Sequence, residues 1–277
     1  MSVVRRLLAA WWLCTLLLTP AAWAASGKDS DTNPFDGVGR AYLVEIDGAV
    51  VWRKAEHTPL APASLTKLMT ALIVAEQVRE DERVTVSAAA ARETGTTLYL
   101  KAGTVFSAQS LLAATLIASA NDACRALADH VAGDQTRFVQ RMNQRAATMG
   151  LRHTRFANAC GHDAPGHYAS VEDLRQLGHA VMAKPQLAAL VGQGEAAIAS
   201  MDGQQRFTLT STNALIGRYN GTVGVKTGTT PQAGKCLIAL VRRGSHTVML
   251  VLLQGKDRWW DTVDVLDIAF ARADAAQ

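Results

Sequence analysis

Apolar residues near the two ends of the chain follow the patterns of β-strands. Two pairs of segments, rich in Val, Leu, Ile and aromatic residues, are each interrupted by a short turn that contains glycine. They cover residues 41–46 and 49–52, and residues 235–241 and 246–254. The first turn is Asp47-Gly48, a dipeptide that accepts the positive φ angles of a tight hairpin. The pattern therefore predicts one β-hairpin toward each end of the chain.

Between the two hairpins, apolar residues recur every three or four positions, which is the spacing of amphipathic helices. In residues 64–78 this spacing includes Leu65, Leu68 and Leu72. Similar patterns predict further helices over residues 110–118, 122–131, 136–149, 170–181 and 257–271. Ser170 at the start of one of these segments is typical of a helix N-cap.

The order of the elements is strands, many helices, strands, and a final helix. Strands from both ends of a chain usually form one antiparallel sheet when the middle of the chain is helical. We therefore expect a mixed α/β (α+β) fold, in which an antiparallel sheet is flanked by helices and an all-helical lobe is inserted between its strands. A cleft between the lobe and the sheet is the expected place for a site.

The first residues have the features of a secretory signal peptide. A short basic region precedes an apolar run over residues 7–18, and a small-x-small cleavage pattern ends at Ala24. Residues 1–24 are therefore predicted to be removed, which places the mature protein in the periplasm. The alternative is a permanent membrane anchor, but the run is short for a bilayer. We expect no stable membrane anchor after cleavage.

The remaining chain is predicted to hold a flexible lead-in and one domain. Residues 25–39 are polar and rich in Ser, Asp, Asn and Gly, a composition typical of flexible segments. Residues 40–277 contain all of the predicted strands and helices. They are long enough for one sizeable core.

Charge and composition exclude several classes of protein. Hydrophobic residues make up 49% and charged residues 19% of the chain, which indicates an ordinary globular protein. The formal charge of +4 includes two arginines of the signal peptide and falls to +2 without them. A balance this near neutral gives no electrostatic reason to expect a nucleic-acid partner.

The cysteines and histidines do not indicate a metal site. Cys124, Cys160 and Cys236 follow the signal peptide, and their wide spacing fits no zinc pattern. One disulfide is compatible with an oxidising compartment, but the spacing does not select a pair. The simpler expectation is that each is a buried thiol. No two histidines share a metal-ligand spacing, so we predict neither a metal nor another cofactor.

The first candidate motif is Ser64-Leu65-Thr66-Lys67. Three residues are nearly one helical turn, so Ser64 and Lys67 share a face. A serine hydroxyl needs a base to become a nucleophile, and an uncharged lysine is a suitable base. Lowering a lysine pKa from about 10.4 to near 7 costs roughly 4 kcal/mol, which burial and a second cation can supply. On its own, the pair also fits an N-capping serine beside a surface lysine.

Two further motifs complete the constellation. Ser119-Ala120-Asn121 lies at the junction of two predicted helices, where its hydroxyl can relay a proton. Lys226-Thr227-Gly228 precedes the late hairpin, and an edge strand there would let a substrate lie along it. Each motif alone is ordinary turn or cap chemistry. The ordered set Ser-x-x-Lys, Ser-x-Asn and Lys-Thr-Gly, however, is the signature of β-lactamases and penicillin-binding proteins.

The sequence around these motifs resembles the serine-type D-alanyl-D-alanine carboxypeptidases of the low-molecular-mass penicillin-binding proteins. The similarity is carried by four stretches and extends from about Ala41 to Phe270. They are residues 62–70, 118–123, 166–170 and 224–230. The resemblance implies a β-lactamase/transpeptidase-like fold, peptidoglycan stem peptides as substrate, and acylation by β-lactam antibiotics. Because the chain ends soon after the motifs, it is more similar to the short, unanchored members.

The resemblance also implies roles for particular residues. Ser64 would be the acylated nucleophile, Lys67 the general base, and Ser119 part of the proton relay. The backbone amides of Ser64 and Thr229 would form the oxyanion hole. The residues implied in substrate binding are Asn121, Lys226, Thr227, Gly228, Thr229 and Arg258. Arg258, near the start of the last predicted helix, would hold the substrate carboxylate together with Thr227.

Three alternatives remain open at this stage. The same chemistry would serve a D,D-endopeptidase that cleaves crosslinks instead of a carboxypeptidase. A serine β-lactamase would need a glutamate after the second motif, whereas residues 159–166 offer only Asp163. A penicillin-sensing domain without catalysis is disfavoured because Lys67 is intact.

Overall fold

The computed structural model describes residues 33–276. The signal peptide expected over residues 1–24 and most of the expected lead-in lie outside the described residues. The helices are α1 (Lys67–Gln77), α2 (Ala108–Leu116), α3 (Asn121–Ala132), α4 (Gln135–Thr148), α5 (Val171–Met182), α6 (Pro185–Val191) and α7 (Trp260–Asp274), with 3-10 turns η1 (Ala63–Thr66) and η2 (Ala90–Arg92). The strands are β1 (Gly39–Ile46), β2 (Ala49–Lys54), β3 (Arg83–Thr85), β4 (Val105–Ser107), β5 (Glu195–Ala199), β6 (Arg206–Thr210), β7 (Thr222–Thr230), β8 (Gly234–Arg243) and β9 (His246–Gly255).

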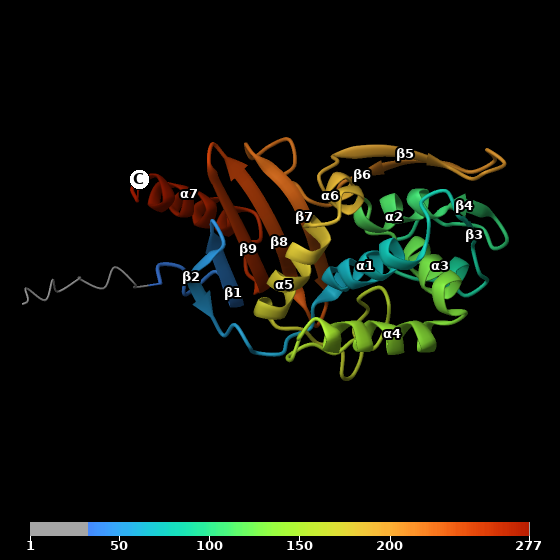
Figure 1. Cartoon of the computed structure of the whole chain (residues 1–277), viewed down its shortest axis with the longest axis horizontal. Coiled ribbons are helices and arrows are strands. Elements are labelled where there is room, and N and C mark those ends of the chain that lie inside the picture. Colours follow the sequence, from blue (N-terminus) through green and yellow to red (C-terminus); the bar gives the residue numbers. More distant parts are fainter. Residues whose placement is uncertain (1–32, 277) are drawn as a thin grey trace, which may run out of the picture. The chain divides into compact units, whose positions relative to one another are not determined.

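The main sheet joins strands from both ends of the chain. Its order is β2-β1-β9-β8-β7, and every neighbouring pair is antiparallel. The two predicted hairpins are β1–β2 and β8–β9, and β1 pairs with β9 from Gly39↔Gly255 to Ile46↔Val248. Strand β7, which carries the Lys-Thr-Gly motif, lies at the edge of the sheet (Figure 1). The predicted antiparallel sheet is confirmed.

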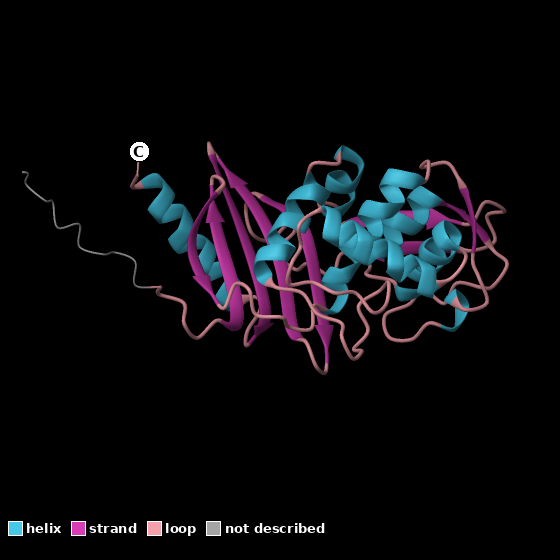
Figure 2. Ribbon diagram, turned by 60° about the horizontal axis from the view of Figure 1, so that its bottom comes forward, coloured by secondary structure: helices cyan, strands magenta, loops and turns pink. Residues whose placement is uncertain are grey.

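Helices cover both faces of the sheet. Successive residues of a strand point to opposite faces, and in the central strands the residues on both faces are apolar. On β8, Ile238 and Leu240 belong to the core shared with α1 and α5. Leu237 and Ala239 belong to a second core, where they pack with α7. Figure 2 shows the helices on either side of the sheet. The three candidate motifs lie on the side of the larger core, where the inserted lobe joins the sheet.

The inserted lobe is not all-helical, which corrects the expectation. It holds helices α1 to α4, but it also holds the two-stranded sheets β3–β4 and β5–β6. Strands β3 and β4 have three residues each, too few for an alternating pattern to stand out. Strand β5 is alanine-rich, a composition that disfavours strands. These strands form because the lobe buries Val84 and Phe106 completely.

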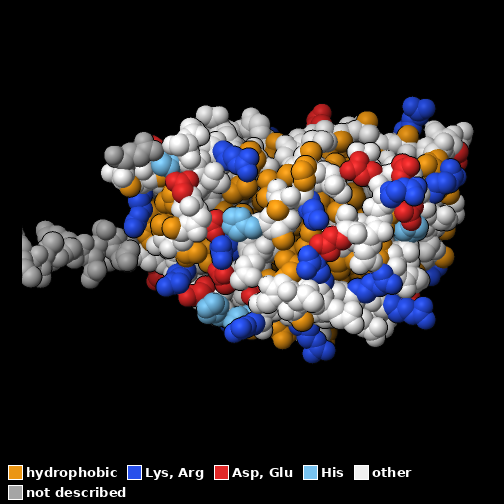
Figure 3. All heavy atoms as spheres, in the orientation of Figure 1, with side chains coloured by type: hydrophobic (Ala, Val, Ile, Leu, Met, Phe, Trp, Pro, Cys, Tyr) orange, Lys and Arg blue, Asp and Glu red, His pale blue; other side chains and the backbone are white. Residues whose placement is uncertain are grey.

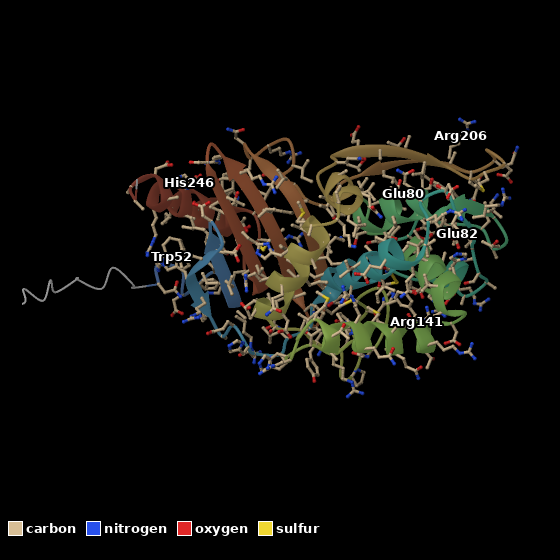
Figure 4. All side chains as sticks on the ribbon, in the orientation of Figure 1. Trp52, Glu80, Glu82, Arg141, Arg206 and His246 are labelled. Carbon is tan, nitrogen blue, oxygen red and sulfur yellow. A yellow bond between two sulfur atoms is a disulfide. The ribbon has the colours of Figure 1, made fainter. Side chains whose placement is uncertain are left out.

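Residues 33–38, expected in a flexible segment, pack against the sheet. Phe35 and Val38 are buried in the second core, and the Phe35 ring meets the Trp52 ring edge-on at 5.2 Å. Figure 4 shows Trp52 on the β2 side of the sheet. Apolar burial of these two side chains fixes a segment whose composition is otherwise polar. The expectation of flexibility is therefore wrong for these residues.

The helix termini follow the sequence signals. Ser170 caps α5 by accepting a hydrogen bond from the backbone amide of Asp173, as predicted.

The surface carries polar contacts and charges of both signs. Arg141 on α4 (Figure 4) donates to Gln77 at the end of α1 over 2.8 Å. Positive and negative side chains are interspersed on the face in Figure 3, in keeping with the near-neutral charge. Within residues 33–276, no helix is long and apolar enough to cross a membrane.

Candidate active site

Ser64 lies on a tight turn that is held between a loop and the edge strand. The turn is η1, and the α-helix begins only at Lys67, one turn later than expected. A Cβ atom on Gly161 would lie 2.0 Å from the carbonyl oxygen of Ala63, and one on Gly228 would lie 2.9 Å from the amide nitrogen of Ser64. Glycine is therefore favoured at both positions, because each brings its backbone against the turn that carries Ser64.

Lys67 contacts Ser64 directly. Its Nζ lies 2.9 Å from Ser64 Oγ, 2.7 Å from Asn121 Oδ1 and 2.6 Å from the carbonyl oxygen of Cys160. The side chain is fully buried. An ammonium group can donate to all three oxygens, whereas a neutral amine can donate to two and accept from the third. Only the serine hydroxyl among the three partners can donate a proton to it.

The electrostatic surroundings favour the neutral form of Lys67. Burial is the largest cause that lowers the pKa of Lys67 well below its usual value, and the charge of Lys226 lowers this pKa further. Glu93 and Asp122 act in the opposite direction. Burial and the charge of Arg258 lower the pKa of Lys226 to about 7. Burial and a second cation are the two influences that make a lysine available as a base.

The second motif places Asn121, but not Ser119, in direct contact with Lys67. Ser119 has a positive φ of 60° between α2 and α3, which is uncommon for a residue other than glycine. Its hydroxyl has no hydrogen-bond partner among residues 33–276. The Asn121 carboxamide is held on both sides, because its Nδ2 donates to the carbonyl of Thr94 over 2.6 Å.

The third motif lies along β7. The Nζ of Lys226 donates to the carbonyl of Thr227 over 3.1 Å, and the side chain is buried. The Thr227 hydroxyl lies 2.6 Å from the Thr212 hydroxyl. Sequence reasoning missed Thr212, because a threonine in a loop carries no distinctive pattern. The three motifs therefore meet around one turn, with β7 on one side and α3 on the other.

Arg258 reaches the same strand from the segment before α7. Its Nη1 donates to the carbonyl of Gly228 over 2.9 Å and to the Thr229 hydroxyl over 3.0 Å. Its guanidinium stacks over the Trp259 ring, 4.6 Å from the centroid. The Nε of Arg258 is buried and has no partner within the described part of the chain. The structure thus brings Arg258 to the end of β7.

The loop of residues 158–163 contacts Lys67 through the carbonyl of Cys160 and the end of β7 through Asp163. Asn158 Oδ1 accepts hydrogen bonds from the backbone amides of Cys160, Gly161 and His162. The Asp163 carboxylate accepts from the Thr230 hydroxyl over 2.6 Å and from a backbone amide in the turn after β7. Asp163 is therefore engaged with the β7–β8 turn. Sequence reasoning missed the Cys160 carbonyl, because a backbone group leaves no sequence signature.

The cysteines correct one expectation. Cys124 and Cys160 form a disulfide that joins α3 to this loop across 36 residues of sequence, so the expectation of separate buried thiols is wrong for both. Cys236 is a buried free thiol, as expected. The pair forms because the first turn of α3 packs against the loop, and this proximity in space could not be read from the spacing.

His167 illustrates a structural histidine close to the site. Its Nδ1 accepts from the backbone amide of Ala157 at 2.9 Å. Its Nε2 therefore carries the hydrogen and donates to the Thr66 hydroxyl over 2.8 Å. Burial lowers the pKa of His167 to about 4. The ring is therefore neutral and supports the turn that carries Ser64 through its contact with Thr66.

A serine hydroxyl within hydrogen-bond reach of a buried lysine amine, beside the edge strand of a sheet, defines the class of serine acyl-transfer enzymes with a lysine base. Comparison with known proteins makes this specific. The chain matches the D-alanyl-D-alanine carboxypeptidase family over residues 38–257. It belongs to this family and is a serine-type D-alanyl-D-alanine peptidase of the penicillin-binding type.

Individual relatives agree with this assignment. Over 97% of its length, the chain is 31% identical to the D-alanyl-D-alanine carboxypeptidase DacF of Bacillus subtilis, of which it spans 72%. It is 32% identical to DacC of Escherichia coli, and the match covers 92% of this chain and 65% of that protein. The crystal structure of penicillin-binding protein D2 from Listeria monocytogenes, in an ampicillin-bound form, superposes with a TM-score of 0.73 at 28% identity. That match covers 84% of this chain and 97% of the other.

Proposed function

We propose that this protein is an exported D,D-peptidase that cleaves the D-Ala-D-Ala bond of peptidoglycan stem peptides through an acyl-enzyme on Ser64. The observation that carries the proposal is the 2.9 Å contact between Lys67 Nζ and Ser64 Oγ, made by a buried amine whose pKa is lowered. Family membership supports the substrate class. The apolar run and cleavage pattern before Ala24 support export to the periplasm.

Acylation follows from the arrangement around Lys67. The neutral amine accepts the proton of the Ser64 hydroxyl, and Oγ attacks the carbonyl carbon of the penultimate D-alanine. The new C–O bond gives a tetrahedral oxyanion, which the backbone amides of Ser64 and Thr229 stabilise. The C–N bond then breaks, and the leaving amine takes the proton that Lys67 received. We assign the relay of this proton to Ser119, whose hydroxyl makes no hydrogen bond within residues 33–276.

The substrate lies along β7 in this proposal. The strand edge supplies backbone hydrogen bonds, and Gly228 lets the strand pass close to the turn that carries Ser64. The terminal carboxylate is held by the Thr227 hydroxyl and by Arg258, whose buried Nε has no partner among the described residues. Asn121 orients the substrate amide, and Lys226 adds positive charge.

The geometry disfavours rapid hydrolysis of β-lactams. A β-lactamase of the glutamate-dependent type needs a carboxylate that activates the deacylating water. The loop offers Asp163, but both of its oxygens accept hydrogen bonds at the β7–β8 turn. A penicillin is therefore expected to form a long-lived adduct on Ser64.

The test uses purified mature protein with labelled penicillin, a pentapeptide that ends in D-Ala-D-Ala, and crosslinked muropeptides. We expect label on Ser64, release of D-alanine from the pentapeptide, and loss of both in Ser64→Ala. Ser110→Ala removes a hydroxyl from α2 and serves as the matched control that keeps both activities. Absence of label on the folded wild-type protein contradicts the proposal. Cleavage of crosslinks without release of terminal D-alanine shows an endopeptidase instead.

A further inference from the structure

The Cys124–Cys160 disulfide joins the two segments that hold Lys67 in place. Lys67 donates to Asn121 Oδ1 over 2.7 Å and to the carbonyl of Cys160 over 2.6 Å. Cys124 follows Asn121 by three residues on α3, so it lies about one helical turn away. The disulfide bonds this helix to Cys160 itself. Both acceptors of the lysine thus belong to one covalently closed unit.

The Asn121 and Cys160 oxygens fix the orientation of the lone pair on Lys67 Nζ. A neutral amine has two N–H bonds and one lone pair. When Asn121 and Cys160 accept the two hydrogens, the lone pair faces the third neighbour, Ser64 Oγ, 2.9 Å away. Deprotonation of the serine needs this orientation. If the Cys160 carbonyl moves, the amine is free to rotate and its lone pair is no longer aimed at the hydroxyl.

Hydrogen bonds hold the loop on both sides of Cys160. The Thr70 hydroxyl donates to the carbonyl of Ala159 over 2.6 Å, and Asn158 Oδ1 accepts from the backbone amide of Cys160. His162 Nε2 lies 2.9 Å from Glu93 Oε2, and Asp163 bonds Thr230. The disulfide is the covalent contact at the Cys160 end, and both of its cysteines are essentially fully buried. Gly161 also presses against Ala63, so a displacement at this end is transmitted to the nucleophile's turn.

We propose that the Cys124–Cys160 disulfide is a positioning element for acylation, which keeps the Cys160 carbonyl in place so that Lys67 presents its lone pair to Ser64. The proposal rests on the proposed function, because it takes Lys67 as the base. It assigns the two cysteines no contact with substrate.

The test removes both sulfurs in Cys124→Ala/Cys160→Ala. It measures the second-order rate of acylation by a fluorescent penicillin from about pH 5 to about pH 10, below the pKa of an unperturbed lysine. We expect the maximum rate to fall about 10- to 100-fold, as for a misplaced catalytic group. Loss of a carbonyl acceptor disfavours the ammonium form, so the pKa of Lys67 falls and the rising limb of the profile moves to lower pH. Leu127→Ala, a buried position on the same helix, is the control for lost stability.

Circular dichroism and the melting temperature show that each variant is folded at the assay temperature. If the double variant does not fold, Cys124→Ala alone breaks the link while it retains the Cys160 side chain, and the same changes are expected. A disulfide-free variant with the wild-type rate and pH profile overturns the proposal, and so does the same shift in Leu127→Ala. Wild-type protein that takes up no penicillin instead refutes the proposed function.

Discussion

Substitution of Gly228 by alanine probes the separation between β7 and the nucleophile's turn. The added Cβ would lie 2.9 Å from both Ala63 Cβ and Ser64 N, and 3.2 Å from the carbonyl oxygen of Pro62. Favourable contacts between carbon atoms need about 3.5 to 4.0 Å. The strand and the turn must therefore separate by roughly 0.6 to 1 Å. Gly228 has no positive φ that would add backbone strain.

The separation acts on the oxyanion hole, whose proposed donors are the amides of Ser64 and Thr229. A misplacement of about 1 Å costs on the order of 100-fold in rate. We expect Gly228→Ala to lower the acylation rate about 10- to 100-fold, which corresponds to about 1.4 to 2.7 kcal/mol in activation free energy. The assay is stopped-flow acylation by a fluorescent penicillin. Gly37→Ala, where a Cβ would meet nothing within 4 Å, is the matched control.

The result that refutes this reasoning is specific. If Gly228→Ala is folded and acylates at the wild-type rate, β7 does not supply a donor whose position matters. A fall of equal size in Gly37→Ala would assign the effect to glycine replacement in general. A crystal structure of the variant then measures whether the strand has moved.

Two further predictions concern charged groups of the site. In Lys226→Met, loss of a buried charge raises the pKa of Lys67, so the rising limb of acylation moves to higher pH. The pKa of Lys226 is about 7 in the folded protein and about 10.4 in the unfolded chain. Burial of the charged lysine therefore lowers the stability of the fold below pH 7, and this cost disappears as the pH rises to about 10.4. In urea unfolding, Lys226→Met should gain up to about 4 kcal/mol in free energy of unfolding at pH 6 and nothing near pH 10. Asp163→Asn should lower the melting temperature, because the carboxylate accepts two hydrogen bonds from the β7–β8 turn. The rate at which the penicilloyl label is lost should not change. A large fall in the rate of deacylation would show that Asp163 activates water.

Much of the fold could be predicted because apolar residues recur along its longer helices and strands at the spacing of those elements. The helices over residues 136–149 and 170–181 were found from apolar spacing and caps, and they agree with α4 and α5 to within a residue or two. The small sheets of the lobe were missed. Strand β5 has the sequence Glu-Ala-Ala-Ile-Ala, whose stability comes from pairing with β6 and from burial of Ile198. Such stabilisation depends on tertiary contacts that periodicity does not contain.

The candidate site could be predicted where side chains form local motifs. Ser64 and Lys67 are one turn apart, so their contact follows from local geometry. Arg258 was expected near the strand, and the structure brings it to Gly228. The Cys160 carbonyl and Thr212 were missed, because their proximity to the motifs arises from the folded chain alone.

The pairing of β1 with β9 has a consequence for biosynthesis. The first strand of the sheet hydrogen-bonds along its length to a strand that ends at Gly255, so the partner is translated about 200 residues later, near the end of the domain. A polypeptide that has been synthesised only as far as Lys226 already contains Ser64 and Lys67, yet it lacks strands β8 and β9 of the sheet. Newly made enzyme should thus stay inert until almost all of its domain has been synthesised, and premature termination before β9 should abolish antibiotic labelling.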